Sequence, residues 1–384
     1  MVIAHFVTRI RNRLSDIDGQ TRSLLQGASL AFLLHGIGAG LAFLLSVVIG
    51  RLLGAEGTGL YFTALSVVSI GSVVARVGLD DTVLRFVATG AANDDWGQVR
   101  GVFRLSLGLS ACIALGLAGL VILFAPILSD RMFANPELAN SLRLIALGIL
   151  SSSMMILVSE TLKGMRLVGK SMLVASVLYP ASALVFIWPL ALSFGHTGAG
   201  IAYCLSTSFS ACVGYVLCRV ENSKHSFSYK SVSIRELWES SRPLWLTALV
   251  NRALLLWAPI LLVGMWSLPS EVGYYGVSTR FSVLISFFLT AINSVLAPQF
   301  ASLYRKGEIG EIERLGRRFS MVVLCVSAPI CALFVVKGGG IMSLYGTEFS
   351  AAGSILAVLS FGQLVNSVLG QGSLILLMAG CGRE

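Results

Sequence analysis

Ten apolar stretches, each of roughly 20 residues or more, constrain this chain more strongly than any other feature of its sequence. A helix of about 20 apolar residues is long enough to cross the hydrocarbon core of a bilayer, which is about 30 Å thick. With 55% hydrophobic and only 12% charged residues, a chain of 384 residues cannot bury so much apolar surface in an aqueous core. The sequence therefore predicts an all-α polytopic membrane protein. The stretches cover residues 24–50, 59–79, 102–128, 138–162, 172–194, 198–218, 243–266, 272–293, 319–336 and 349–379.

The distribution of positive charge tests this count of spans. Cytoplasmic loops are enriched in Lys and Arg. With the N-terminus inside, 21 of the 28 Lys and Arg residues fall in inner segments and four in outer segments, while Arg76, Arg252 and Arg280 lie within spans. The net charge of +9 then reflects topology and contact with membrane lipids, and no nucleic acid partner is expected. We expect a multi-pass protein of the bacterial cytoplasmic (inner) membrane with a cytoplasmic N-terminus.

One nucleotide-binding motif has to be weighed against this topology. The segment GMRLVGKS, residues 164–171, matches the phosphate-binding loop G-x-x-x-x-G-K-[ST] at every fixed position. Such a loop needs a buried strand before it and a helix after it, so that backbone N–H groups can surround the phosphates. Here the segment lies in a short inner turn between the fourth and fifth spans. The sequence favours a basic turn that holds two helices at the membrane surface.

Neither metal nor cofactor chemistry is expected. The seven cysteines include no C-x-x-C pair, and the four histidines lie far apart in the sequence. No H-E-x-x-H motif, nucleophile elbow or pair of carboxylates occurs within a span, so we assign no catalytic residue, no metal ligand and no cofactor.

An internal repeat predicts two halves of the molecule. A shift of 214 residues aligns RGVFRLS (residues 100–106) with RLGRRFS (314–320), and also aligns Gly59 with Gly273 and Tyr61 with Tyr275. The same shift superposes spans one to four on spans seven to ten. Six helices separate the partners, so the halves have the same orientation and are expected to be two parallel-repeat helical bundles around a central cavity.

The repeat also predicts domain boundaries. We expect a basic N-terminal segment (residues 1–23), a first bundle of six helices (24–219), a cytoplasmic connector (220–242) and a second bundle (243–384). The counterparts of the fifth and sixth spans would begin near residue 386, beyond the sequence. The second bundle is therefore expected to be truncated, with the alternative that the natural protein is asymmetric.

Several segments resemble a known transporter family. RLLGAEGTGLY (residues 51–61), ARVGLDDTVLRFVA (75–88), SLPSEVGYYGVSTR (267–280) and APQFASLYRKGE (297–308) are similar to the polysaccharide transporter family. These proteins are the O-antigen and capsule-type flippases of the multidrug/oligosaccharidyl-lipid/polysaccharide exporter superfamily. The resemblance implies an exopolysaccharide-type flippase that moves a polyprenyl-diphosphate-linked oligosaccharide by alternating access. Its implied partners are this lipid-linked glycan, membrane lipids and a polysaccharide polymerase or chain-length machinery.

Four residues within the spans are the candidate substrate-binding residues. Arg252 and Arg280 lie near the expected midplane, about 14 Å and 12 Å from the two surfaces, and guanidinium groups suit the oxygens of a diphosphate. Arg76 and His35 are weaker candidates. The alternatives are helix-packing arginines bonded to carbonyls or hydroxyls, an Arg76 that extends to the inner surface, and a packed neutral His35. No carboxylate is expected deep in a span to neutralise these arginines, and Asp80 and Asp81 are expected at the inner surface, pairing with Arg85 or rimming a vestibule.

Three competing functions stay open from sequence alone. An ion-coupled multidrug exporter of the same superfamily would need an acidic residue within the membrane. An integral membrane glycan polymerase or acyltransferase would show a large outer loop or a group of catalytic side chains. A non-transporting scaffold would leave the midplane arginines without a purpose. We expect a flippase and not an enzyme.

Overall fold

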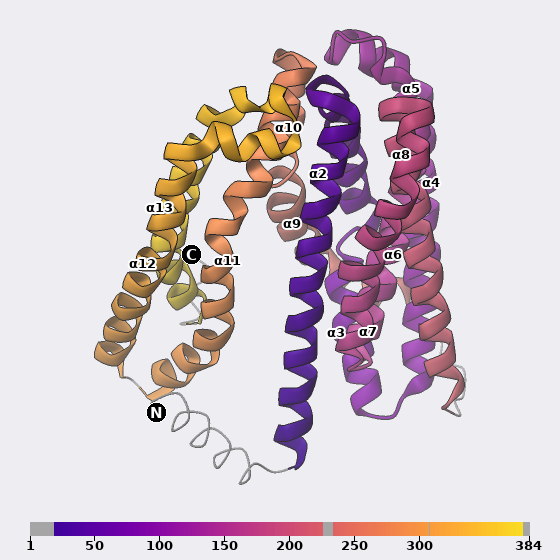
Figure 1. Ribbon diagram of the computed structural model, residues 1–384. Coiled ribbons are helices and arrows are strands. Elements are labelled where there is room, and N and C mark those ends of the chain that lie inside the picture. Colours follow the sequence, from indigo (N-terminus) through magenta and orange to yellow (C-terminus); the bar gives the residue numbers. More distant parts are fainter. Residues whose placement is uncertain (1–18, 226–232, 307, 379–384) are drawn as a thin grey trace. The chain divides into compact units, whose positions relative to one another are not determined.

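The computed structural model describes residues 19–225, 233–306 and 308–378, and every element in these ranges is a helix (Figure 1). The all-α prediction is therefore confirmed for this part of the chain. The predicted N-terminal segment, up to residue 18, and residues 226–232 of the predicted connector lie outside the described residues.

Long apolar helices lie at most of the positions where the sequence predicts membrane spans, although the predicted count of ten is not tested. Six helices are long and apolar enough to cross a bilayer, or seven if the bent pair Ile234–Leu254 and Ala258–Trp266 forms one span. Two of them contain a glycine with non-helical geometry, Gly54 (φ 67°) in α2 and Gly195 (φ 56°) in α8. Each break falls between two of the predicted spans, so each long helix corresponds to a pair of spans.

Side chains on these helices face outward in the manner of a membrane protein. Leu123 is 70% exposed and Val336 is 75% exposed, although both are large and apolar. A bilayer removes the penalty that water would impose on such surfaces. The protein is therefore a multi-pass membrane protein.

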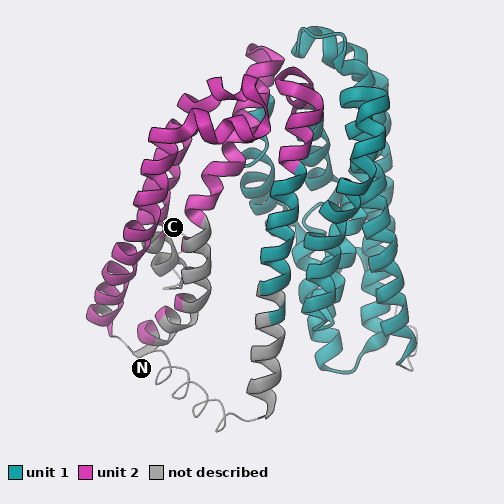
Figure 2. Ribbon diagram, in the orientation of Figure 1, with its two compact units in different colours: residues 1–45, 64–262 teal, residues 46–63, 263–384 magenta. Residues whose placement is uncertain are grey.

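The chain forms two compact units (Figure 2). Unit 1 comprises residues 1–45 and 64–262, and unit 2 comprises residues 46–63 and 263–384. The domain boundaries predicted from the repeat stay a prediction.

The helices of unit 1 after α2 (Gly19–Arg76) are α3 (Leu79–Ala92), α4 (Trp96–Ile127), η1 (Leu128–Met132), α5 (Leu138–Ile145), α6 (Gly148–Gly164), α7 (Val168–Met172), η2 (Leu173–Leu178), α8 (Tyr179–Ser223), α9 (Ile234–Ala248), η3 (Leu249–Leu254) and the start of α10 (Ala258–Trp266). Unit 2 contains residues 46–63 of α2 and the end of α10, followed by α11 (Pro269–Lys306), α12 (Ile309–Met342), η4 (Ser343–Tyr345), η5 (Thr347–Ala352) and α13 (Gly353–Met378).

Helix α6 is the central helix of unit 1. In the most apolar stretch of the span that α5 and α6 form, Leu138–Gly164, 67% of the residues are buried inside the protein, against 17–28% in the other candidate spans. It packs against α3, α4 and α8, and Leu157 and Val158 on neighbouring positions contribute to two separate hydrophobic clusters. The turn at the end of this helix carries the segment GMRLVGKS. Residues 165–167, with Arg166 at φ 62°, form a short turn between the end of α6 at Gly164 and the start of α7 at Val168, so the predicted turn between two helices is confirmed.

Two glycines that the repeat aligns lie against each other within unit 2. A Cβ on Gly59 would lie 1.7 Å from the carbonyl oxygen of Pro269, and a Cβ on Gly273 would lie 2.3 Å from the carbonyl oxygen of Ala55. Ala55 and Pro269 are themselves related by the shift of 214 residues. The contact is thus reciprocal, as a two-fold relation between repeated helices requires. The repeat and the truncation of the second bundle stay predictions.

Candidate functional site

A break between α2 and α3 brings charged residues into the interior of unit 1. α2 ends at Arg76, Val77 and Gly78 adopt positive φ angles of 49° and 71°, and α3 begins at Leu79. A Cβ on Gly78 would lie 2.5 Å from the carbonyl oxygen of Ser241 in α9, so glycine is required for this close approach. The break places Asp80 and Asp81 in the first turn of α3, where the helix dipole favours negative charge.

These carboxylates form one cluster with two of the predicted arginines. Nε of Arg76 donates to Oδ2 of Asp80 at 3.3 Å, and Nη1 of Arg252 donates to the same oxygen. Nη2 of Arg252 donates to both oxygens of Asp81, at 3.1 and 3.3 Å. We call Arg76, Asp80, Asp81 and Arg252 the four-charge cluster; its formal charge is zero.

The cluster has a buried end and an accessible end. The side chains of Arg76 and Asp80 are 3% and 2% exposed, whereas those of Arg252 and Asp81 are 42% and 38% exposed. Removing one member of a buried ion pair leaves an uncompensated charge, whereas an exposed pair contributes little. The buried pair therefore holds the cluster in place, and the accessible pair is the part that can exchange partners.

Hydroxyl groups extend the buried end toward α6. Nη1 of Arg76 donates to Oγ of Ser72 at 2.5 Å, and Oγ of Ser153 lies 3.3 Å from the same oxygen. Oδ1 of Asp80 is buried and has no hydrogen-bond partner among the described residues. Such an orphaned oxygen is costly in a nonpolar setting, so it marks a position where a further donor would be favourable.

A local irregularity in the helix places Arg252. The residue lies in η3, a π-helical segment that follows α9, and the chain bends by 46° between this segment and α10. π-Helical turns frequently occur at functional positions because they rotate side chains out of the regular helical register. Its neighbour Asn251 bonds instead to the carbonyl of Thr247 at 3.0 Å.

The structure corrects two expectations about these charges. The expectation that no carboxylate neutralises the span arginines is wrong for Arg76 and Arg252, because Asp80 lies deep in unit 1 and bonds both. The expected pairing of the aspartates with Arg85 is also wrong. Nη2 of Arg85 donates to Oγ of Ser240 at 3.0 Å.

The other two candidate residues lie outside the cluster. Arg280 is exposed on α11 in unit 2, and its Cζ lies 5.7 Å from the centroid of the Phe62 ring, in cation–π geometry. No carboxylate pairs with it among the described residues. His35 is exposed on the first half of α2 in unit 1. The roles of all four residues in substrate binding stay predictions.

The sequence contains one signal that could have identified the buried pair. Arg76 and Asp80 are four residues apart, the spacing at which opposite charges meet on a helix. Ser72 extends the same spacing by another turn. The contribution of Arg252 to this group has no comparable local signal, because it depends on packing between helices that are far apart in the chain.

Comparison with known proteins assigns the fold and then the family. A solved multidrug resistance MATE family transporter of the MOP superfamily, in an inward-facing conformation, superposes with a TM-score of 0.73 at 15% identity, covering 92% of this chain and 85% of that chain. The fold is therefore that of MOP superfamily transporters. The family described as polysaccharide biosynthesis protein matches residues 24–304. This chain belongs to that family, and the resemblance to polysaccharide transporters is confirmed.

Two relatives from Haloferax volcanii carry related names. The probable low-salt glycan biosynthesis flippase Agl15 of Haloferax volcanii is 22% identical over 342 residues, which are 88% of this chain and 68% of that protein. The probable flippase AglR of the same organism is 26% identical over 193 residues, covering 50% of this chain and 40% of that protein.

Proposed function

We propose that this protein is a flippase that moves a lipid-linked oligosaccharide, with a polyprenyl diphosphate carrier, across the cytoplasmic membrane by alternating access. The family match and the flippase relatives support transport of a glycan precursor. The observation that carries the substrate assignment is the partly exposed guanidinium of Arg252, which bonds two carboxylates in the first turn of α3. Translocation, rather than covalent chemistry, is the proposed activity.

Exchange of ion-pair partners is the proposed binding step. The Arg252 guanidinium can release Asp81, which is 38% exposed, and bond the diphosphate while the Arg76–Asp80 pair remains buried. Two N–H groups of a planar guanidinium can donate to two oxygens of one phosphate. Arg252 would therefore make about as many charge-assisted hydrogen bonds to the diphosphate as it makes to Asp81. Arg280, exposed and free of a carboxylate among the described residues, is a second proposed cation for an anionic substrate.

Replacing both arginines tests this proposal. We expect the double variant Arg252→Ala, Arg280→Ala to lose surface glycan by at least about tenfold, the effect of about 1.4 kcal/mol in affinity, while its amount in the membrane is unchanged. The measurement is surface glycan per unit of inserted protein in cells that depend on this gene. Arg235→Ala, Arg242→Ala is the matched control, since Arg235 is 87% exposed and Arg242 is exposed. Normal surface glycan in the first double variant would reject the assignment.

An ion-coupled multidrug exporter is the second candidate function. Asp80 supplies a buried carboxylate, which the sequence analysis did not expect, and its Oδ1 has no partner among the described residues. Against this role, its other oxygen accepts from both Arg76 and Arg252, so the site is already neutralised. Efflux of a cationic dye that depends on a proton or sodium gradient, and that is lost in Asp80→Asn when compared per unit of inserted, folded protein, would favour the exporter.

A further inference from the structure

Helices α4 and α8 lie side by side in unit 1 at the end where α4 begins and α8 ends (Figure 1). Three pairs of side chains join the two helices in this region. They are Trp96 with His225, whose stacked rings have centroids 3.6 Å apart, Arg100 with Asn222, whose carbonyl oxygen accepts from Nη2 at 3.2 Å, and Phe103 with Tyr215, whose stacked rings have centroids 5.8 Å apart. Residue numbers rise along α4 while those of the partners fall, so the pairs fix an antiparallel register.

This register brings three arginines together. Arg219 lies on α8 about one turn before Asn222, which bonds Arg100. Arg100 and Arg104 are four residues apart, so they occupy the same face of α4. The positive charges of Arg104 and Arg219 both act on the guanidinium of Arg100. We call Arg100, Arg104 and Arg219 the three-arginine site.

The three-arginine site lacks matching negative charge in the described part of the chain. Arg104 and Arg219 are exposed, and neither forms an ion pair among the described residues. Glu221, close to Arg219 on α8, pairs instead with Lys170 and Lys224 at 3.3 and 3.0 Å. Because like charges repel at short range, an anion bound among the three guanidiniums would stabilise their arrangement.

The position of the site along the helices fits the headgroup region of a bilayer. The span that begins with α4, Trp96–Met132, has 37 residues. This is about 55 Å of helix, whereas the hydrocarbon core is about 30 Å thick. Arg100 and Arg104 lie within the first three turns, and Arg219 lies about one turn before the end of α8 at Ser223. The distribution of Lys and Arg predicts that this end faces the cytoplasm, where anionic lipids give the membrane a negative surface.

Exposed apolar surface continues from the site toward the middle of α8. Tyr215 and Val216 precede Arg219 by about one turn and are 44% and 57% exposed. Cys212 is exposed about one turn further along the same helix. An acyl chain attached to a phosphate at Arg219 would therefore meet apolar side chains, whereas a soluble anion would leave them uncovered.

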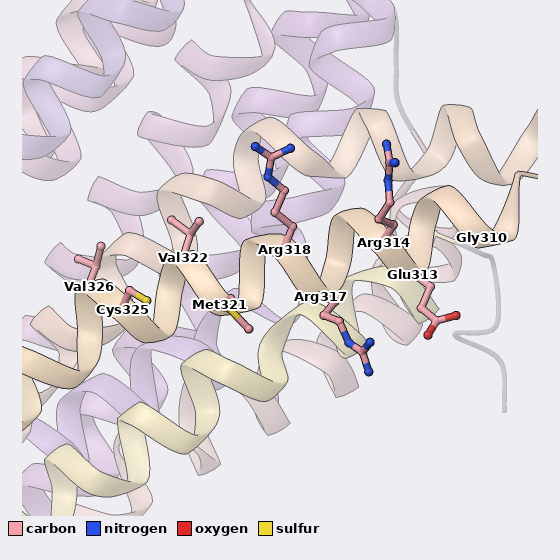
Figure 3. A pocket seen from close by; sticks show the side chains of 9 residues that line it. All are labelled: Gly310, Glu313, Arg314, Arg317, Arg318, Met321, Val322, Cys325 and Val326. Carbon is pink, nitrogen blue, oxygen red and sulfur yellow. The ribbon is translucent and has the colours of Figure 1, made fainter.

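The predicted repeat contains the same pair of arginines in unit 2. The shift of 214 residues aligns Arg100 with Arg314 and Arg104 with Arg318. Arg314 and Arg318 point to the same side of α12 from successive turns (Figure 3). Two arginines on one face near the start of a span thus occur in both units. In unit 1, α8 supplies the third arginine.

We propose that the three-arginine site binds the phosphate of an anionic phospholipid, with one acyl chain against Tyr215 and Val216. Charge complementarity favours an anionic lipid over a zwitterionic one, because the arginines repel the ammonium group of a zwitterionic headgroup. The exposed apolar side chains favour a lipid over a free phosphate. The site shares no residue with the four-charge cluster, and lipid binding there does not require transport of a glycan.

The exposed thiol of Cys212 reports on occupancy of this site. The purified full chain is reconstituted in nanodiscs of phosphatidylcholine alone or with about 30% phosphatidylglycerol, and alkylation by a membrane-permeant maleimide is followed by mass spectrometry. Leu192→Cys adds a reference thiol, since Leu192 is 66% exposed on the same helix. We expect phosphatidylglycerol to slow labelling of Cys212 at least about threefold, as roughly two-thirds occupancy requires, and to leave the reference thiol unchanged.

Matched variants separate this site from general lipid contact. Arg104→Gln, Arg219→Gln should abolish the protection, whereas Arg235→Gln, Arg242→Gln, which removes the same charge from exposed positions of α9, should retain it. Arg104→Lys, Arg219→Lys keeps the charge and should retain the protection, which covers the case in which the glutamine variant does not fold. Glycerol phosphate added to the phosphatidylcholine discs should give no protection.

Four results would each overturn the proposal. They are equal slowing at Cys212 and the reference thiol, protection that survives in the folded glutamine variant, loss of protection in the lysine variant, and full protection by glycerol phosphate. Native mass spectrometry provides a second readout that does not depend on the thiol. The glutamine variant should retain less phosphatidylglycerol than the variant at Arg235 and Arg242, and equal retention would count against the site.

Discussion

At the scale of single residues, burial separates two aspartates that are adjacent in the sequence. Asp80 is 2% exposed and bonds two guanidiniums, whereas Asp81 is 38% exposed and, among the described residues, pairs with Arg252 alone. Their chemistry is identical, so the difference in their roles comes entirely from the position of each on the first turn of α3. A buried pair is sensitive to loss of one member, and a half-exposed pair is not.

This difference predicts unequal effects on stability. Asp80→Asn leaves the buried Arg76 without a full counter-charge, so we expect the free energy of unfolding to fall by about 3–5 kcal/mol. For Asp81→Asn we expect it to fall by less than about 1 kcal/mol. The measurement is the thermal unfolding of each detergent-solubilised variant, with size-exclusion chromatography as the readout. The double variant Arg76→Gln, Asp80→Asn should recover part of the loss, because it removes both charges. An Asp81 variant as unstable as the Asp80 variant would contradict the burial argument.

At the scale of secondary-structure elements, glycines determine where helices stop and how closely they approach. The breaks at Gly54 and Gly195 divide two long helices into pairs of spans, and the break at Gly78 forms the start of α3. Gly59 and Gly273 lie within helices. Because neither has a side chain, the backbones of the two facing helices can approach each other closely there.

The facing glycines predict a strong dependence on residue size. Alanine at either position would place a Cβ 1.7 or 2.3 Å from a carbonyl oxygen, and such overpacking costs about 1–3 kcal/mol. We expect Gly59→Ala and Gly273→Ala each to lower the thermal midpoint of the detergent-solubilised protein. Gly116→Ala in α4 is the control, because a Cβ there meets no atom within 4 Å and alanine favours the helix. If all three variants behaved alike, the close contact would be rejected.

The limits of prediction from the sequence follow from the range of each interaction. The spans could be predicted because each is encoded by about 20 neighbouring residues, and the turn at 164–171 could be separated from a nucleotide site by its surroundings. The pairing of Arg252 with Asp80 could not, since 172 positions separate the two residues. The apolar pattern specifies which segments enter the membrane but not which polar side chains meet there.

At the scale of the whole molecule, the charge distribution predicts the orientation of the chain. Exposed Asp94, between α3 and α4, is expected inside, and exposed Glu137, before α5, is expected outside. A cysteine introduced at Glu137 in a cysteine-free background should react with an impermeant maleimide in intact cells. A cysteine at Asp94 should react only after the membrane is opened. The reverse pattern would invert the topology.

The reciprocal approach of Gly59 and Gly273 bears on how such a chain could arise. In a symmetric dimer of a half-length ancestor, the same glycine would lie on both sides of the interface. A larger residue at that one position would therefore clash in both copies. Gene fusion would separate that one position into two, each free to mutate alone, and yet both still carry hydrogen as their side chain. Under the predicted repeat, the close contact between the two backbones would have persisted although each glycine could mutate on its own.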